Sequence, residues 1–318
     1  MKLVSGLYKA LHSLASGQMT KNPPERGEKP TRTSRKSGRG EGFRSRGTKG
    51  PSSARPTRSK GLRQHGAVQA PRKRGKRGTK SGGKGWIWGW HAVTAVLANP
   101  RRTLHELVMT EAAEKRYAPA VPPLPARILE PHALDNLLPA GAVHQGIAVK
   151  AAPLEWAPLE SLAAETDLVL VLDQITDPHN VGAMLRLASA FGAGALVMQD
   201  RNAPPLSGAT AKVAVGCLES VPTALVTNIA NTLESLKSGG FEVIGLAGET
   251  DLTLADALSG PGKRALVMGA EGPGLRPRVA ATCDRLARIP MQSDGSPGSA
   301  ESLNVATAAA IALYEARR

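Results

Sequence analysis

The sequence predicts an α/β protein whose larger part is a parallel sheet with helices on both faces. Between residues 167 and 318, short runs of Val, Leu, Ile and Ala alternate with stretches of helical periodicity. Apolar runs without polar interruption, such as residues 168–172, belong in parallel sheets that are covered on both sides. A change of composition near residue 85 separates this folded part from a basic N-terminal extension.

Residues 1–85 form the basic extension. They hold 23 lysines and arginines against three acidic residues, whereas the rest of the chain holds 18 against 23, so the formal net charge of +15 belongs to the extension. From residue 18 onward large apolar side chains are almost absent, and we expect disorder because little surface can be buried. A solubilising tail and an RNA-binding arm both fit; the arm is favoured because polycations neutralise phosphates. Residues 1–17 predict a short helix of unknown use, with a targeting peptide as the alternative.

The cysteines and histidines give no sign of a metal site or a disulfide framework. Cys217 and Cys283 lie far apart in the sequence, and no pair of histidines has a metal-binding spacing. No apolar run reaches the roughly 18 residues that a membrane helix needs. We therefore expect a cytoplasmic protein with neither a metal nor a membrane partner.

Residues 86–150 predict a small α/β domain. A buried strand at Trp86-Ile-Trp is followed by a turn at Gly89 and a helix to about Ala98. A strand at 106–109, an apolar segment at 127–129, a helix at 131–138 and an apolar run within 141–149 complete the alternation. Residues 151–166, with two prolines, are expected to form a linker.

Residues 167–318 alternate strand and helix throughout. The predicted strands are 168–172, 195–198, 223–226, 241–246, 264–268 and 285–289, and the predicted helices lie near 180–191, 208–218, 228–237, 277–282 and 302–316. The last helix is apolar nearly all round, so we expect it to be buried. Order and pattern alone predict an ordinary doubly wound sheet.

Three stretches of this domain carry polar or glycine-rich patterns. They are Asp173-Gln-Ile-Thr-Asp-Pro-His-Asn-Val-Gly-Ala-Met-Leu-Arg, Gly269-Ala-Glu-Gly-Pro-Gly, and Ser302-Leu-Asn-Val-Ala at the start of the last helix. The glycine-rich stretch has the spacing of neither a dinucleotide fingerprint nor a phosphate loop, yet its glycines permit close approach to a ligand. An asparagine at an apolar helix start is either a cap or a site residue.

In this order, the three stretches resemble the motifs of the SpoU/TrmH family of RNA ribose 2′-O-methyltransferases, which belong to the SPOUT class. The resemblance covers residues 166–318 and implies a trefoil-knotted sheet, a homodimer and S-adenosylmethionine as methyl donor. A donor without phosphate suits the glycine-rich stretch. The segments Gly89-Trp-His-Ala-Val and Gly141-Ala-Val-His-Gln-Gly-Ile are similar to the L30e-like RNA-binding domain found in the ribosomal-RNA branch of this family.

The resemblance also implies the site residues. Cofactor-binding positions would be Gly269, Gly272, Ile289, Met291 and Leu303. Catalytic positions would be Asn180, Arg186, Glu271, Ser302 and Asn304. A guanidinium keeps its proton above about pH 12, so we expect Arg186 to stabilise a phosphate and the developing alkoxide rather than act as a base. Glu271 is expected to orient Arg186 or a group of the partner subunit by a charge-assisted bond.

The reaction that the resemblance implies is methyl transfer to a ribose 2′-oxygen of RNA. The chain is most similar to the branch of the family that methylates a guanosine of 23S ribosomal RNA, so such a guanosine is the expected substrate. One alternative is a transfer-RNA ribose methyltransferase. Another is a non-catalytic RNA-binding or ribosome assembly factor on the same fold, against which the retained polar residues argue. The loop between Met291 and Ser302 is several residues longer than is usual in the family.

Overall fold

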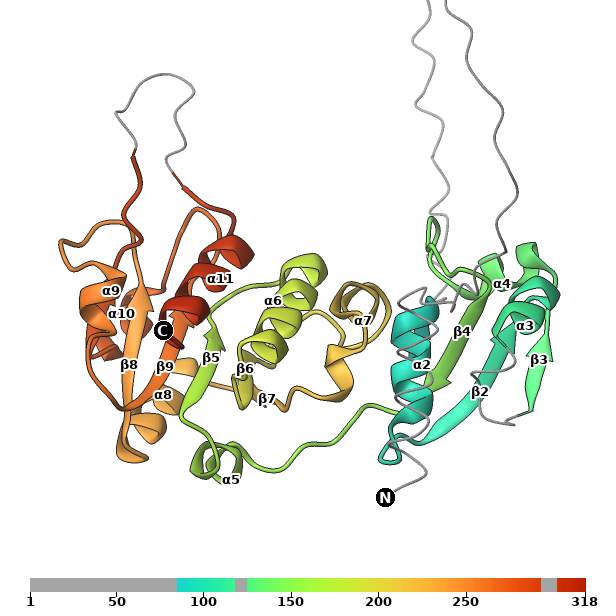
Figure 1. The fold of residues 1–318 in the computed structure, drawn as a ribbon, viewed down its shortest axis with the longest axis horizontal. Coiled ribbons are helices and arrows are strands. Elements are labelled where there is room, and N and C mark those ends of the chain that lie inside the picture. Colours follow the sequence, from blue (N-terminus) through green and yellow to red (C-terminus); the bar gives the residue numbers. More distant parts are fainter. Residues whose placement is uncertain (1–84, 118–124, 293–301) are drawn as a thin grey trace, which may run out of the picture. The chain divides into compact units, whose positions relative to one another are not determined.

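The computed structural model describes residues 85–117, 125–292 and 302–318 of the chain. The basic extension and the helix expected near its start lie outside these ranges, as does most of the loop between Met291 and Ser302. The described residues form two sheets with their helices (Figure 1). None of their helices has the length and apolar character needed to cross a membrane.

A four-stranded sheet lies within residues 86–151. Its order is β1-β4-β2-β3, in which β4 is antiparallel to both neighbours and β2 is parallel to β3. The elements are β1 (Trp86–Trp88), α2 (Trp90–Ala98), β2 (Leu104–Met109), α3 (Glu111–Tyr117), β3 (Ala126–Ile128), α4 (Pro131–Leu137) and β4 (Ile147–Ala151). The expected alternation is present, and helix α3 is an addition to it.

Strand β1 shows why this domain begins abruptly. Trp86 and Trp88 pack into one apolar cluster and Ile87 into another, so the strand is buried on both faces. The expected turn at Gly89 is real, and its φ of 87° lies in the left-handed region that favours glycine. On the Ile87 side, Trp90 stacks on Tyr117 with ring centroids 4.0 Å apart.

The second sheet has six strands, all parallel, in the order β10-β8-β9-β5-β6-β7. Its strands are β5 (Leu168–Leu172), β6 (Ala195–Gln199), β7 (Thr223–Val226), β8 (Phe241–Leu246), β9 (Lys263–Met268) and β10 (Arg285–Ala287). Its helices are α5 (Leu159–Ala164), α6 (Pro178–Ala190), α7 (Gly208–Ala214), α8 (Ile229–Ser238), α9 (Leu254–Ala257), α10 (Pro277–Thr282) and α11 (Val305–Glu315), with a 3₁₀ turn, η2 (Cys217–Glu219), after α7. The predicted parallel α/β class is confirmed.

Helices cover both faces of this sheet, as its apolar strands require (Figure 1). Leu168, Leu170 and Leu172 of β5 join the cluster that holds the apolar faces of α6, α7, α9 and α11. Val169 and Val171 point to the other face, where α5, α8 and α10 pack. The period of two along β5 thus places the two layers.

Four details differ from the expectation. The interval predicted as a linker contains α5, and the four-residue α9 was not predicted. Helix α7 ends early because Val215 and Gly216 both adopt positive φ, so η2 follows as a separate turn. Helix α11 starts at Val305, because the side chain of Asn304 caps it.

The expectation that the last helix is buried all round is wrong for the described chain. Helix α11 packs through Val305, Ala309, Ala312 and Leu313, which are buried, mainly against α6. On its outer side Ile311 is 38% and Tyr314 60% exposed. The trefoil knot stays a prediction, since part of the segment between β10 and α11 lies outside the described residues.

Arg317, just beyond α11, ties the end of the chain to the sheet. Its guanidinium donates to both carboxylate oxygens of Asp167, each at 2.9 Å, and to the carbonyl oxygens of Phe191 and Gly192 at 2.8 and 2.6 Å. The hydrogen bond from Arg317 lowers the pKa of Asp167. The start of β5, the end of α6 and the end of the chain therefore meet at one guanidinium.

Candidate active site

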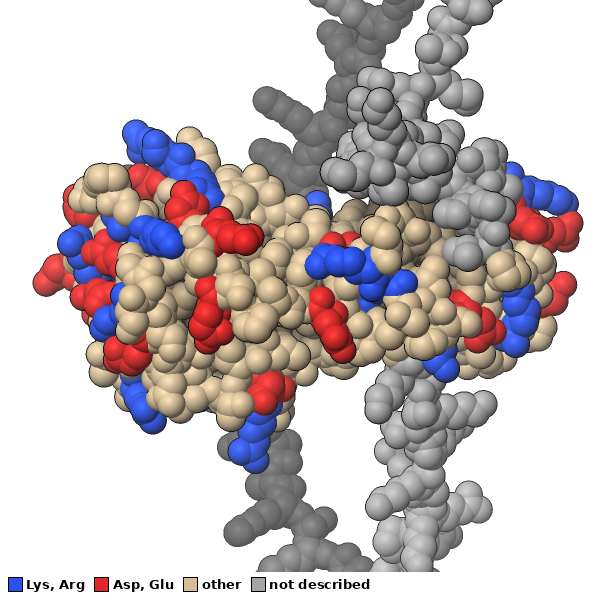
Figure 2. Space-filling view, turned by 90° about the horizontal axis from the view of Figure 1, so that it is seen from below, with Lys and Arg blue, Asp and Glu red and all other residues tan. Residues whose placement is uncertain are grey.

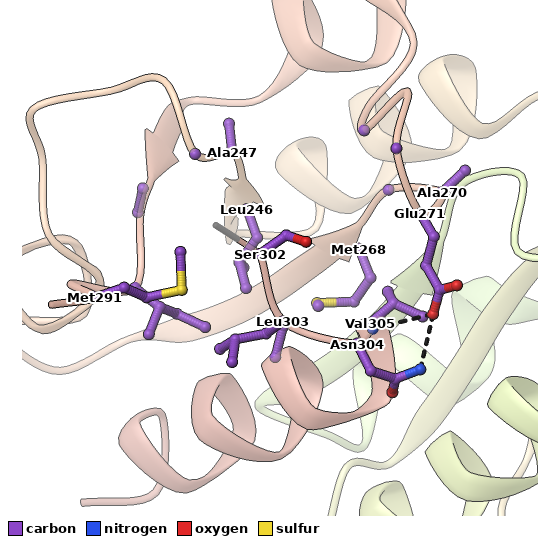
Figure 3. A pocket seen from close by; sticks show the side chains of 17 residues that line it. Leu246, Ala247, Met268, Ala270, Glu271, Met291, Ser302, Leu303, Asn304 and Val305 are labelled. Carbon is purple, nitrogen blue, oxygen red and sulfur yellow. Dashed lines mark hydrogen bonds between the residues drawn. The ribbon is translucent and has the colours of Figure 1, made fainter. Parts of the chain in front are cut away.

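A cavity of about 410 Å³ opens at the carboxyl ends of β8 and β9 (Figure 3). Its walls come from these strand ends, from the segment after β10, from the glycine-rich turn after β9, and from the start of α11. This is the edge at which parallel sheets bind ligands. All five residues expected to bind a cofactor line it: Gly269, Gly272, Ile289, Met291 and Leu303. Three of the expected catalytic residues do so as well: Glu271, Ser302 and Asn304.

The glycine-rich turn needs its glycines first for its own closure. A Cβ on Gly269 would lie 2.3 Å from the carbonyl carbon of Gly274, and Ala270 and Gly274 exchange two backbone hydrogen bonds of 3.1 and 2.9 Å. Gly272 and Gly274 have φ of 82° and 68°, with open space where a Cβ would stand. The turn thus folds back on itself and presents its backbone along the cavity.

Asn304 is both a helix cap and a site residue. Its Oδ1 accepts from the backbone N–H groups of Ala306 and Thr307 at 2.9 and 3.3 Å. Its Nδ2 donates to Oε1 of Glu271 at 2.8 Å and to Oδ1 of Asn180 at 3.2 Å. The two interpretations that the sequence left open therefore hold together.

Glu271 receives three hydrogen bonds on one oxygen (Figure 3 draws those from Asn304 and Val305). Its Oε1 accepts from Nδ2 of Asn304, from Nδ2 of Asn180 at 3.1 Å and from the backbone N–H of Val305 at 3.4 Å. The asparagines orient this carboxylate, and among the described residues no bond joins it to Arg186, one of its two expected partners. The charge-assisted pair with Arg186 is thus not formed within one chain.

Asn180 is placed by the local structure of α6. Asp177 caps this helix by accepting from the backbone N–H groups of His179 and Asn180 at 3.3 and 3.2 Å, and Pro178 occupies the first turn. Arg186 lies six residues beyond Asn180, about 240° around the helix, and its side chain is exposed. It does not line the cavity described above. The structure therefore brings Asn180, Glu271 and Asn304 together and leaves Arg186 apart.

Two residues that the sequence interpretation did not single out form an ion pair beside the turn, in which one partner is buried and the other is 33% exposed. Asp173 follows β5 and has no exposed surface. Its carboxylate accepts from the backbone N–H of Arg276 at 2.9 Å, from Nε of Arg276 at 2.7 Å and from Nη2 of Arg276. An aspartate that directly follows an uninterrupted apolar strand was the available signal, because such a carboxylate must find partners.

The cysteines offer no nucleophile at this site. Burial raises the pKa of Cys283 to about 12, so its thiol stays protonated at neutral pH. Neither Cys283 nor Cys217 lines the cavity. Within the described ranges, no group of three or more His, Cys, Asp or Glu residues is placed to hold a metal ion.

The fold and the cavity define a class of protein: an α/β domain that binds a small molecule at the carboxyl edge of a parallel sheet. Residues 167–314 match the model of the SpoU rRNA methylase family, and residues 86–157 match the model described as RNA 2′-O ribose methyltransferase substrate binding. The chain belongs to the SpoU rRNA methylase family, as the motif resemblance implied.

Relatives and solved structures agree with this membership. The chain is 41% identical over 244 residues to the 23S rRNA (guanosine-2′-O-)-methyltransferase RlmB of Photorhabdus laumondii. The matched residues are 73% of this chain and 97% of that relative. A putative RNA methyltransferase of the TrmH family from Porphyromonas gingivalis is 29% identical with a TM-score of 0.58, covering 73% and 88%. The SpoU methyltransferase AviRb from Streptomyces viridochromogenes, in complex with the cofactor AdoMet, is 23% identical with a TM-score of 0.59, covering 76% and 93%, and shows the fold alone.

Proposed function

We propose that the chain transfers the methyl group of S-adenosylmethionine to the ribose 2′-oxygen of a guanosine in 23S ribosomal RNA. One observation carries the proposal. Eight residues that the motif resemblance implied, drawn from three separate segments, line a single cavity in a chain similar to RlmB enzymes of that activity. We place the reaction in the cytoplasm.

The cavity suits the methyl donor in size and chemistry. Its volume of about 410 Å³ lies within the range of roughly 300–1,000 Å³ typical of small-molecule sites. Leu246, Met268 and Ile289 offer apolar walls for an adenine ring. The carboxylate of Glu271 also lines the cavity, and its negative charge attracts the positively charged sulfonium group of the donor. We assign the backbone of Gly269, Ile289 and Leu303 to the adenosine and methionine parts, with Met291 and Gly272 beside them.

The acceptor oxygen needs help from the protein, because a ribose hydroxyl is a poor nucleophile until its proton leaves. The donor is already activated by its positive charge. Arg186 would stabilise the developing alkoxide and a neighbouring phosphate, while Asn180, Glu271, Ser302 and Asn304 position the reactants. Because Arg186 is exposed and does not line the cavity of its own chain, this role requires a second subunit whose site it completes.

A homodimer is supported by the outer side of α11. Ile311 and Tyr314 are exposed there, and Tyr314 meets Phe191 at the end of α6 edge-on, with ring centroids 6.4 Å apart. A second copy that covered α6 and α11 would bury these apolar side chains and approach Arg186, which is on α6.

The dimer leads to a prediction for Tyr314→Glu. Placing a charge in the proposed interface should shift the protein from dimer to monomer and abolish methylation, while S-adenosylmethionine still binds the intact cavity. Light scattering measures the mass and calorimetry the binding. Leu225→Glu, at a side chain of β7 that is 51% exposed, is the control and should leave a dimer. A fully active Tyr314→Glu monomer would contradict a site built from two chains.

RNA recognition is assigned to the other parts of the chain. We propose that the L30e-like domain of residues 86–150 selects the site and that the basic extension of residues 1–85 adds contacts to phosphates. Figure 2 supports this division, because the face that it shows carries basic and acidic side chains interspersed. The excess of positive charge is in the extension.

Mapping of ribose methylation across all cellular RNA tests the proposed reaction. In a strain that lacks the protein, one guanosine of 23S ribosomal RNA should lose its methyl group and regain it when the wild-type gene is restored. Loss at a transfer-RNA nucleotide instead would identify the alternative substrate. If no nucleotide changes, the chain is a non-catalytic RNA-binding or assembly factor.

A further inference from the structure

We propose that Asp173 and Arg276 form a positioning pair, which holds the glycine-rich turn in the conformation that binds the methyl donor. The inference rests on the proposed function, because it concerns the same cavity. Neither residue lines the cavity, so both would act through the turn.

The ion pair holds the two ends of the glycine-rich turn close together. Strands β5 and β9 are neighbours, with Leu172 paired to Met268, so Asp173 and Gly269 follow at the same edge of the sheet. Six residues beyond Gly269 the chain reaches Leu275 and then Arg276, which precedes α10. Asp173, at the end of β5, accepts from both the backbone N–H and the guanidinium of Arg276. It therefore holds the C-terminal end of the turn next to β9, the strand from which the turn starts.

A second contact ties the same two segments together at the rim of the cavity. Asn180, in the segment after Asp173, donates to Glu271 in the turn at 3.1 Å. The base of the turn is thus fixed by an ion pair and its rim by a side-chain hydrogen bond. Between them, Ala270 and Gly274 exchange two backbone hydrogen bonds, which give the turn its shape. Loss of the ion pair would release the Gly274 end of the turn first.

The burial of Asp173 argues for positioning over simple stabilisation. Asp173 is buried and gives up its hydration, whereas the Arg276 side chain is 33% exposed, and an ion pair that holds a buried carboxylate contributes little net stability compared with apolar side chains of similar volume. Apolar residues could fill the space but could not fix a backbone N–H and a guanidinium at set distances. The pair therefore gives this turn a defined conformation, which a cavity lined by turn backbone needs.

Arg276→Lys tests the proposal without leaving Asp173 as a lone buried charge. Lysine keeps the positive charge but loses the planar fork that binds two donors to one carboxylate. The backbone N–H at position 276 still donates. We expect a folded protein whose dissociation constant for S-adenosylmethionine, measured by calorimetry, rises about tenfold because the cavity wall is displaced by a fraction of an ångström. Hydrogen exchange of the Ala270 and Gly274 amides should become faster, and saturating S-adenosylmethionine should restore the protection of both amides.

Arg264→Lys is the matched control. Arg264 also forms an ion pair, of 2.9 Å with Glu242, and its side chain is 10% exposed against 33% for Arg276. It lies at the amino end of β9, away from the cavity. Its replacement should lower the melting temperature without changing cofactor affinity or exchange in the turn. Asp173→Asn provides a second variant, which should weaken cofactor binding further if it folds.

Three outcomes are distinguishable. Wild-type affinity and wild-type exchange in Arg276→Lys would overturn the positioning role. An equal loss of cofactor affinity in Arg264→Lys would overturn it too, because the effect would then be general destabilisation. If the wild-type protein itself binds no S-adenosylmethionine, the proposed function fails, whereas the exchange difference between the two variants still tests the effect of the ion pair on the turn.

Discussion

Arg186→Ala should lower the rate of methyl transfer by about 10²–10³-fold, the usual loss when a group that stabilises developing charge is removed. The dissociation constant of S-adenosylmethionine should stay within about threefold of the wild-type value, a difference below 1 kcal/mol. The reason is geometric, since the side chain is exposed on α6 and does not line the cavity of its own chain. Single-turnover methylation of RNA measures the first quantity and calorimetry the second.

Arg278→Ala is a suitable control for this experiment. Arg278 is on α10, which covers the other face of the sheet, and donates to Oδ1 of Asn231. Its removal should leave methyl transfer nearly unchanged. If Arg186→Ala loses cofactor binding and activity in parallel, Arg186 maintains the fold of the site and has no role at the reacting oxygen.

Asn304→Ala should damage both the helix and the site. Loss of the cap costs about 1 kcal/mol of stability. Loss of the Nδ2 bonds also frees Glu271 and Asn180, so we expect the cofactor to bind about tenfold more weakly and methyl transfer to fall by about 10²-fold. Thermal unfolding, calorimetry and single-turnover rates separate the effects.

Asn228→Ala isolates the contribution of the cap. Asn228 caps α8 by accepting from the backbone N–H of Asn231 at 3.2 Å, on the face of the sheet away from α11. Both variants should lose similar thermal stability, whereas only Asn304→Ala should lose cofactor affinity and rate. Equal activity in the two variants would mean that Asn304 serves the helix alone.

The strands were the most predictable part of the fold. Residues 168–172 form an apolar run that is buried on both faces, and β5 has these same bounds. The order of the strands could not be predicted, because the apolar run of β8 does not indicate that this strand pairs with both β9 and β10. Such pairing is decided by the whole sheet, and a periodicity reports only the nearest residues.

The last helix illustrates a limit of apolar periodicity. Its sequence of Ala, Val, Ile and Leu is apolar on every side, so the pattern predicts burial without saying which side could face outward. The structure assigns Ile311 and Tyr314 to the outer side of the single chain. A sequence pattern cannot separate burial within a chain from burial between chains.

In the site, motif spacing predicted which residues meet but not how they bond. Glu271 was expected to orient Arg186 or a group of the partner subunit, and within the described chain its bonds come from two amides and a backbone N–H. Asp173 was missed because an aspartate in a loop is usually solvated, and its complete burial depends on the return of Arg276 from another segment.

The contacts of Arg317 make the last residues of the chain part of its fold. The pKa of Asp167 is lowered, so the stability from this contact is present above the ordinary aspartate pKa of about 3.9 and is lost only as the pH falls through the lower folded value. The contact therefore persists throughout the physiological pH range. Because Asn304 caps the start of α11 and Arg317 follows its last turn, the ion pair with Asp167 holds the helix that carries Asn304 to the start of β5.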